Sequence, residues 1–318
     1  MSDPYGQWQA VQSWVRQGEW ATLQEQWQGQ NPEMRQAILS ALGESSHPQA
    51  IALLTEGLQD DDPEIQDLAG KALGRMGETA VPILSQAIAT LGERAALALT
   101  RIHHPTIVPP LLAVWSHLSD RGRAQVLAAL HPWRDAAVLA QLQAALDDPA
   151  PIVQREAVIG LGLAAQQGES TDLSRLVPFL AHPDLAPAAV EALGRAKAVE
   201  RLRRSLPAAP AAVIPAIAVA LAGIGTEEAL VLLASLLDTA VNPIPIVVGL
   251  ARHGGAAHLV KLWHQQHPCF GQPAVRRELA IVAQDPELLT TLTSDEDALV
   301  ALYARHRLTT PLGERGRA

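Results

Sequence analysis

The stretch that decides the fold is residues 61–77, which read DDPEIQDLAGKALGRMG. Asp62 is a good helix N-cap, and Pro63 suits the first helical turn, where its missing N–H costs nothing. One apolar stripe then follows at helical spacing and ends at two glycines, Gly74 and Gly77. Its members are Ile65, Leu68, Ala69, Ala72 and Leu73. A second apolar stripe covers residues 81–88, with Pro82 in its opening turn. Because one pair of helices cannot bury both stripes alone, we expect it to stack on neighbouring pairs.

Helix endings of the same kind recur about every 30 residues, the spacing of helical-pair repeats. They are Leu42-Gly43, Leu73-Gly74, Leu161-Gly162, Leu193-Gly194 and Ile224-Gly225, with Ile102, Leu130, Leu250 and Val282 at the same interval. Openings made of a polar residue and a proline also recur, at Asn31-Pro32, Asp148-Pro149, His182-Pro183 and Asn242-Pro243. The sequence therefore predicts an all-α, HEAT-like helical-repeat solenoid of about nine antiparallel helix pairs in a right-handed superhelix.

Three segments are expected along the chain. Residues 1–30 form tryptophan-rich capping helices, residues 31–293 form the repeats, and residues 294–318 form a closing helix and a basic tail. We expect Trp8, Val11 and Val15 to share a helix face that seals the core, and Trp14 to be either part of the cap or an exposed docking residue.

At the other end of the chain, the closing helix is expected to use Leu299, Leu302 and Tyr303 as its capping residues. The stretch from Arg305 to Ala318 is expected to fray.

Composition narrows the functional classes. The formal net charge of −9 argues against a general nucleic-acid binder, which needs a basic face to displace counterions from phosphate. The single cysteine, Cys269, allows no intrachain disulfide, which favours a reducing, cytoplasmic location. No apolar run approaches the roughly 20 residues that span a bilayer, so we expect no membrane insertion.

The densest basic cluster comprises Arg195, Lys197, Arg201, Arg203 and Arg204. Lys197, Arg201 and Arg204 recur at helical spacing, and such a face could bind an acidic partner, since Arg makes bidentate contacts with carboxylates. The alternative is a solvated helix face, because Glu191 and Glu200 lie within reach.

A second polar cluster contains His258, His264, His267 and Cys269. It allows three interpretations, which are a zinc site, a reactive thiol at Cys269 whose pKa is lowered by His267, or an inert buried cysteine. Histidine also precedes proline at His47, His104, His131, His182 and His267, which we interpret as turns rather than as a series of metal ligands. The sequence contains neither Gly-x-Ser-x-Gly nor a phosphate-binding Gly-x-x-x-x-Gly-Lys, so enzymes of those two classes are set aside and no catalytic residue is predicted. We also predict no metal site, because His258 points away from His264 and His267 and Pro268 should end the helix before Cys269.

The repeat pattern of a capping residue, a proline, an acidic residue and an Ala-Leu-Gly ending at residues 72–74 and 192–194 resembles the phycobilisome lyase type of HEAT-like repeat, over nearly the whole chain. Members of that family include cyanobacterial E/F-type phycobilin lyases, which attach linear tetrapyrroles to cysteines of phycobiliproteins and act as heterodimers, and proteins that help dismantle phycobilisomes. Another HEAT-like family, the di-iron deoxyhypusine hydroxylases, uses adjacent His-Glu pairs, and this sequence has none.

The resemblance implies a scaffold or chaperone-like factor that acts on a phycobiliprotein or another photosynthetic complex. The arginine face could then hold the propionates of a tetrapyrrole. One alternative is a true phycobilin lyase, with a linear tetrapyrrole as its bound substrate and no resident cofactor. The other is an adaptor unrelated to pigment, because many chains with such repeats have no chemistry of their own.

Overall fold

The computed structural model describes residues 4–29, 31–45, 47–169, 171–240 and 242–309. Throughout these residues the regular structure is α-helix and 3₁₀-helix, without a strand. The predicted all-helical, HEAT-like repeat fold is confirmed. The chain divides into two compact units, Met1–Gly160 and Leu161–Ala318.

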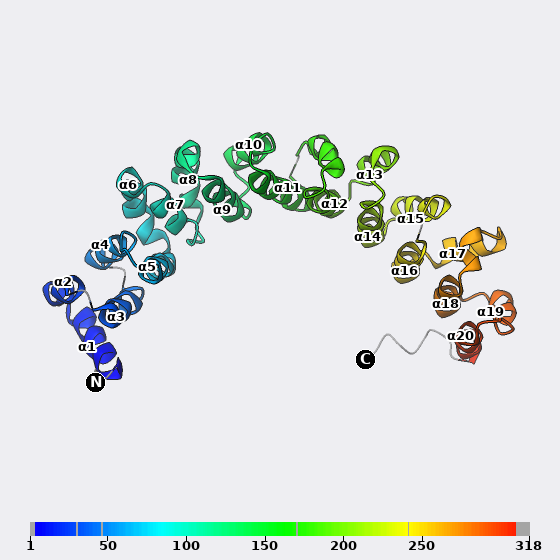
Figure 1. Ribbon diagram of the computed structural model, residues 1–318, viewed down its shortest axis with the longest axis horizontal. Coiled ribbons are helices and arrows are strands. Elements are labelled where there is room, and N and C mark those ends of the chain that lie inside the picture. The colour runs from blue at the N-terminus through cyan, green and yellow to red at the C-terminus, as the bar shows by residue number, and fades with distance from the viewer. Residues whose placement is uncertain (1–3, 30, 46, 170, 241, 310–318) are drawn as a thin grey trace. The chain divides into compact units, whose positions relative to one another are not determined.

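The first unit stacks helices in two layers (Figure 1). Helices α1, α3, α5, α7 and α9 pack on one another in succession and form one layer, while α2, α4, α6, α8 and α10 form the other. The elements are α1 (Pro4–Gln17), α2 (Trp20–Gln28), α3 (Pro32–Leu42), α4 (Pro48–Gly57), α5 (Pro63–Met76), η1 (Gly77–Ala80), α6 (Val81–Leu91), α7 (Glu93–Leu99), η2 (Pro105–Ile107), α8 (Val108–Val114), η3 (Trp115–His117), α9 (Asp120–Leu130), α10 (Ala136–Ala145) and most of α11 (Pro151–Gln166).

The second unit repeats the arrangement after the end of α11. One layer, which we call the α12–α20 layer, contains α12, α14, α16, α18 and α20, each packed on the next (Figure 1). The elements are η4 (Leu173–Ala181), α12 (Ala186–Arg195), α13 (Val199–Ser205), η5 (Leu206–Ala208), α14 (Ile214–Ile224), α15 (Glu227–Ser235), η6 (Leu236–Asp238), α16 (Ile244–Arg252), α17 (Ala256–His264), η7 (Pro268–Gly271), α18 (Pro273–Val282), α19 (Pro286–Leu292) and α20 (Ala298–Thr309).

The glycines of the recurring helix endings allow neighbouring helices of a layer to approach closely. A β-carbon added at Gly162 of α11 would lie 2.6 Å from both Cα and Cβ of Ala192 in α12. The same small-on-small contact recurs between Gly43 and Ala72, Gly194 and Ala220, and Gly249 and Ala222, at 3.0–3.1 Å from the added atom. The Leu-Gly pairs at 42–43, 161–162 and 193–194 therefore combine a buried leucine with a glycine that sets the distance between repeats.

An arginine in the first turns of one helix is bound to an aspartate just before the next helix of the same layer. These pairs are Arg35 with Asp60, Arg123 with Asp148 and Arg276 with Asp295. In each case the same carboxylate also accepts the backbone N–H two residues on, at Asp62, Ala150 and Asp297. Each pair thus fixes the start of one helix to the side of the preceding one.

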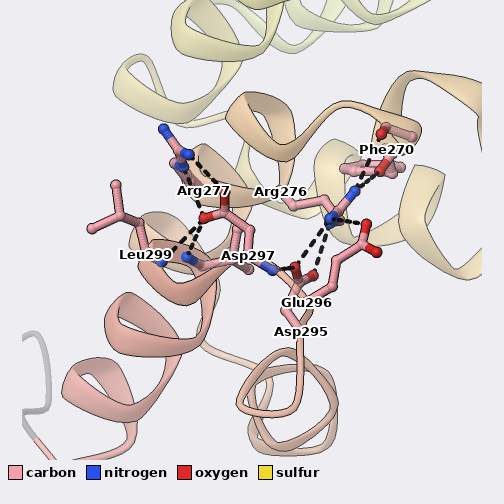
Figure 2. Close-up of polar contacts among 9 residues, drawn as sticks. Phe270, Arg276, Arg277, Asp295, Glu296, Asp297 and Leu299 are labelled. Carbon is pink, nitrogen blue, oxygen red and sulfur yellow. Dashed lines mark hydrogen bonds and ion pairs between the residues drawn. The ribbon is translucent and has the colours of Figure 1, made fainter.

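The last of these pairs is the most buried. The Arg276 guanidinium reaches Asp295 through two bonds of 2.7 and 3.0 Å, Glu296 through one, and the carbonyls of Phe270 and Gly271 (Figure 2). It therefore links η7 to the loop before α20. Beside it, Arg277 binds both carboxylate oxygens of Asp297 at 3.1 and 2.6 Å.

Two of the five predicted helix starts are correct as placed, whereas α12 begins at Ala186 rather than at Pro183 and α16 at Ile244 rather than at Pro243. Asn31 and Asp62 cap α3 and α5 through their side chains, with prolines at the first helical position. Asp148 instead accepts from the N–H of Ala150, so α11 begins at Pro151 rather than at Pro149.

The histidines that precede prolines lie at turns, as predicted. The ring Nδ1 of His47, His104, His182 and His267 each accepts the backbone N–H two residues later. His131 differs, because it closes α9 and its Nε2 lies 2.9 Å from the carbonyl oxygen of Glu156.

Both ends of the chain differ from the prediction. Val11 is fully buried, but Trp8 is 40% exposed and so does not seal the core. In α20 the buried residues are Val300, Ala301 and Ala304, whereas the predicted capping residues Leu299, Leu302 and Tyr303 are 44%, 58% and 38% exposed. The small residues face the core because α18 packs closely on α20.

The predicted fraying after Arg305 is wrong as far as Thr309, which still belongs to α20. The rest of the predicted tail lies outside the described residues.

Candidate protein-binding surfaces

The predicted basic face is only partly helical. Arg201 and Arg204 lie on α13 at positions i and i+3 and therefore share a face. Lys197 precedes α13 in the turn after α12, with a φ of 52°, so it is not on that helix and the predicted three-residue face is wrong for Lys197. A left-handed backbone at a lysine is uncommon, and the glycine that the sequence offers, Gly194, is still within α12.

The arginines of this cluster lie close to carboxylates. Arg204 is bound to Glu200 at 3.0 Å, and Arg203 is bound to Glu200 and to Glu228 of the next repeat. Arg195 is bound to Glu191 one turn earlier on α12. These pairs are well exposed, so each contributes little to stability and reduces the positive charge available to a partner.

Arg201 is half-buried. The pKa of Asp172 lies below its usual value, mainly because of hydrogen bonds from Ser174, with smaller contributions from the charges of Arg201 and Arg175. Arg201 therefore acts electrostatically on a carboxylate of its own unit.

Trp14 is half-buried on α1. Trp8, one and a half turns earlier, is the more exposed of the two, contrary to the predicted order. Trp20 on α2 stacks on the His47 ring with centroids 4.4 Å apart.

At the predicted thiol site, the contacts of His267 are with Asp238 and with the backbone of Cys269. The His267 ring binds outward to Asp238 at 3.1 Å and accepts the N–H of Cys269, while the cysteine side chain is buried. Burial raises the pKa of the Cys269 thiol to about 11, the opposite of the shift expected from a neighbouring histidine. At neutral pH only about one thiol in 10⁴ is then ionised, which disfavours nucleophilic chemistry.

His264 and His267 line one open pocket of about 550 Å³ together with Trp263 and Phe270. They bind different carboxylates, with His264 at 3.5 Å from Asp285. Among the described residues no three side chains are placed to hold a metal ion.

A surface that the sequence reasoning missed lies on α14. This helix reads IPAIAVALAGI and contains no polar side chain. Ile217, Ala218, Leu221 and Ala222 are buried, but Val219, about 200° around the helix from Ile217, is 66% exposed. A helix that is apolar on every side normally lies inside a protein.

Val219 borders an open groove of about 490 Å³, which we call the α12–α14 groove. Its apolar lining is Pro187, Val190 and Gly194 of α12 with Ala216, Val219, Ala220 and Gly223 of α14. The only charged side chains in the lining are Glu191 and Arg195, which neutralise each other. The groove can therefore receive an apolar surface without leaving a charge unpaired.

Comparisons with known proteins agree with the fold. Residues 21–94 match the family model described as HEAT repeats. An engineered protein of known crystal structure is 20% identical, with 95% of this chain and 90% of that chain covered and a TM-score of 0.37. Human deoxyhypusine hydroxylase in complex with glycerol is also 20% identical, with 85% and 97% covered and a TM-score of 0.34. At these TM-scores neither likeness carries an argument about function. No protein of curated function matches the sequence.

None of the helices in the described residues is both long and apolar enough to cross a membrane.

Proposed function

We propose that this chain is a protein-binding helical-repeat scaffold and that the α12–α14 groove is its docking surface. The observation that carries the proposal is α14, whose 11 residues lack a polar side chain although Val219 is exposed. Solvent-exposed helix faces of repeat proteins are normally polar, so an apolar face at Val219 supports a surface that a partner covers.

The contribution of Val219 to the binding free energy follows from its exposed fraction. Burying a fully exposed valine side chain is worth about 1.5–3 kcal/mol. Val219 starts at 66% exposure, so its burial is worth about 1–2 kcal/mol. Val219→Asp would remove this gain and would place a carboxylate in an apolar interface, so binding should weaken at least about tenfold. The fold should persist, because substitutions at exposed positions usually change stability by about 0.5 kcal/mol or less.

The class of partner is proposed from the resemblance of the repeats. It is a phycobiliprotein or another subunit of a photosynthetic complex, bound during assembly, chromophore handling or turnover. We would immobilise the wild-type chain, Val219→Asp and Val231→Asp and identify what each retains from a cyanobacterial lysate by mass spectrometry. Val231 is a matched control, because it is 49% exposed on α15, in the other layer.

Retention of a phycobiliprotein or photosynthetic subunit by the wild type and by Val231→Asp, but not by Val219→Asp, would support both parts of the proposal. Equal retention by all three proteins would overturn the groove as the docking surface. Retention of no photosynthetic protein would overturn the proposed partner and favour an adaptor unrelated to pigment.

The lyase alternative is separated by a different measurement. Co-expression with an acceptor phycobiliprotein and a linear tetrapyrrole should increase chromophore attachment if this chain is a lyase. Attachment no greater than without the chain would exclude that activity. The buried thiol of Cys269 offers no support for a covalent tetrapyrrole intermediate.

A further inference from the structure

The exposed apolar position of α14, which borders the α12–α14 groove, recurs on the next helix of the α12–α20 layer, α16. In α14, Ile217, Ala218 and Leu221 are buried and Val219, on the other side of the helix, is exposed. In α16, Ile246, Val247 and Leu250 are buried at the corresponding positions, and Val248 is half-exposed. Val219 and Val248 therefore occupy equivalent positions on adjacent, packed helices.

We propose that these two positions receive one amphipathic α-helix of the partner, lying across α14 and α16, with apolar residues seven apart and an acidic flank. The inference rests on the proposed function and specifies what the docking surface recognises.

The spacing favours a helix over an extended segment. Adjacent packed helices lie about 8–10 Å apart, so Val219 and Val248 should be separated by a similar distance. Residues i and i+7 of an α-helix lie on one face, about 10.5 Å apart. An extended strand presents residues on one face about every 6.6 Å, so its same-face residues fall at about 6.6 and 13 Å and miss both positions.

The charges along the groove favour an acidic flank. One turn after Val248 on the same helix face is Arg252, which is exposed and has no ion pair among the described residues. The corresponding residue of α12, Arg195, is already bound to Glu191. The opposite edge, at the helix N-termini, is formed by the uncharged residues Pro187, Pro215 and Pro245.

The dipole of α16 opposes this preference but is the weaker effect. A helix C-terminus carries about half a negative charge, whereas Arg252 carries a full positive charge on a side chain that can extend toward the partner. The C-terminus of α14 lies at the same edge and adds about another half charge, so the attraction comes from direct pairing of a partner carboxylate with Arg252 rather than from the net field.

Designed peptides can test this recognition. The probe is a fluorescein-labelled helix of about three heptads with leucine at the apolar positions and glutamate on one flank. A second peptide carries lysine in place of each glutamate, and a third has the first composition in shuffled order. Fluorescence anisotropy measures their affinity for the full chain and for Val219→Asp, Arg252→Glu and Val231→Asp, after circular dichroism has confirmed equal helix content.

The glutamate peptide should bind the wild type at least about tenfold more tightly than the lysine peptide or the shuffled peptide does. In Arg252→Glu, the preference for the glutamate peptide over the lysine peptide should fall or reverse. Val219→Asp should weaken the glutamate peptide about tenfold, and Val231→Asp should not. Equal binding of the glutamate and lysine peptides, a preference unchanged in Arg252→Glu, or no binding of either peptide would overturn the inference. If lysate capture still depended on Val219 in that case, the proposed function would stand and only the acidic helix would be wrong.

Discussion

The contact between Gly162 and Ala192 gives a direct test of how this fold is built. Replacing Gly162 by alanine adds one methyl group, whose carbon would lie 2.6 Å from the Cα and Cβ of Ala192. One of these atoms is backbone, so α11 and α12 must move apart rather than a side chain rotate. Overpacking of this kind costs about 1–3 kcal/mol.

Gly223 is the matched control, since it also lies in a helix of the second unit and a β-carbon there would meet nothing within 4 Å. Alanine is favoured over glycine inside a helix by about 1 kcal/mol, and this gain is common to both variants. Gly223→Ala should therefore stabilise the protein by about 0.5–1 kcal/mol. Gly162→Ala should be less stable than Gly223→Ala by the overpacking cost of about 1–3 kcal/mol.

The assay is thermal unfolding followed by circular dichroism, with urea unfolding as a second measurement. For a unit of this size 1 kcal/mol shifts Tm by about 2–4 °C, so the two variants should differ by several degrees. If Gly162→Ala were as stable as Gly223→Ala, the close approach of α11 and α12 would not depend on this glycine. The glycines of the Leu-Gly endings would then not be what sets the distance between repeats.

Two further predictions concern the arginines. Arg276→Ala should lower the free energy of unfolding by about 3–5 kcal/mol, because it leaves the buried carboxylate of Asp295 without its partner. Arg203→Ala breaks only exposed pairs and should cost about 1 kcal/mol or less, measured in the same urea titration. Similar losses for both would show that the Arg276 network is not a structural link. Replacing Arg201 and Arg204 together by glutamate should leave folding nearly intact and weaken capture of an acidic partner, and wild-type capture should fall as salt rises. Unchanged capture without salt dependence would leave these arginines as a solvated helix face.

The repeat fold could be predicted because its signals are local. Asp62, Pro63 and the stripe ending at Leu73 and Gly74 are close in sequence, and the same pattern recurs at a constant interval. The prediction failed where the identity of the packed face depends on a neighbour. Leu299 and Leu302 have helical spacing and are larger than the residues that α20 buries, but close packing selects the small side chains.

The arginine link at the C-terminal end could not be predicted for a related reason. Arg276 and Asp295 lie 19 positions apart, and nothing in either segment specifies the pairing. In three repeats an arginine at the fourth position of a helix pairs with an aspartate just before the next helix of the layer. The pairing can be recognised only by comparing these three repeats. The apolar helix 214–224 was visible in the sequence, because it lacks any polar residue, but which of its faces stays uncovered depends on how α12 and α16 pack.

The two candidate surfaces of the second unit differ in what they can supply to a complex. The α13 arginines lie close to carboxylates of their own unit, and exposed pairs of this kind are typically worth about 0.2–1 kcal/mol. A partner that recruits Arg203 or Arg204 must first displace Glu200 or Glu228, so the net gain is smaller still. Burial of Val219, which starts at 66% exposure, is worth about 1–2 kcal/mol and displaces no existing contact. The binding free energy should therefore come mainly from the α12–α14 groove, while the neighbouring cations set orientation and association rate. A complex built in this way would lose affinity strongly through Val219→Asp and only modestly through added salt.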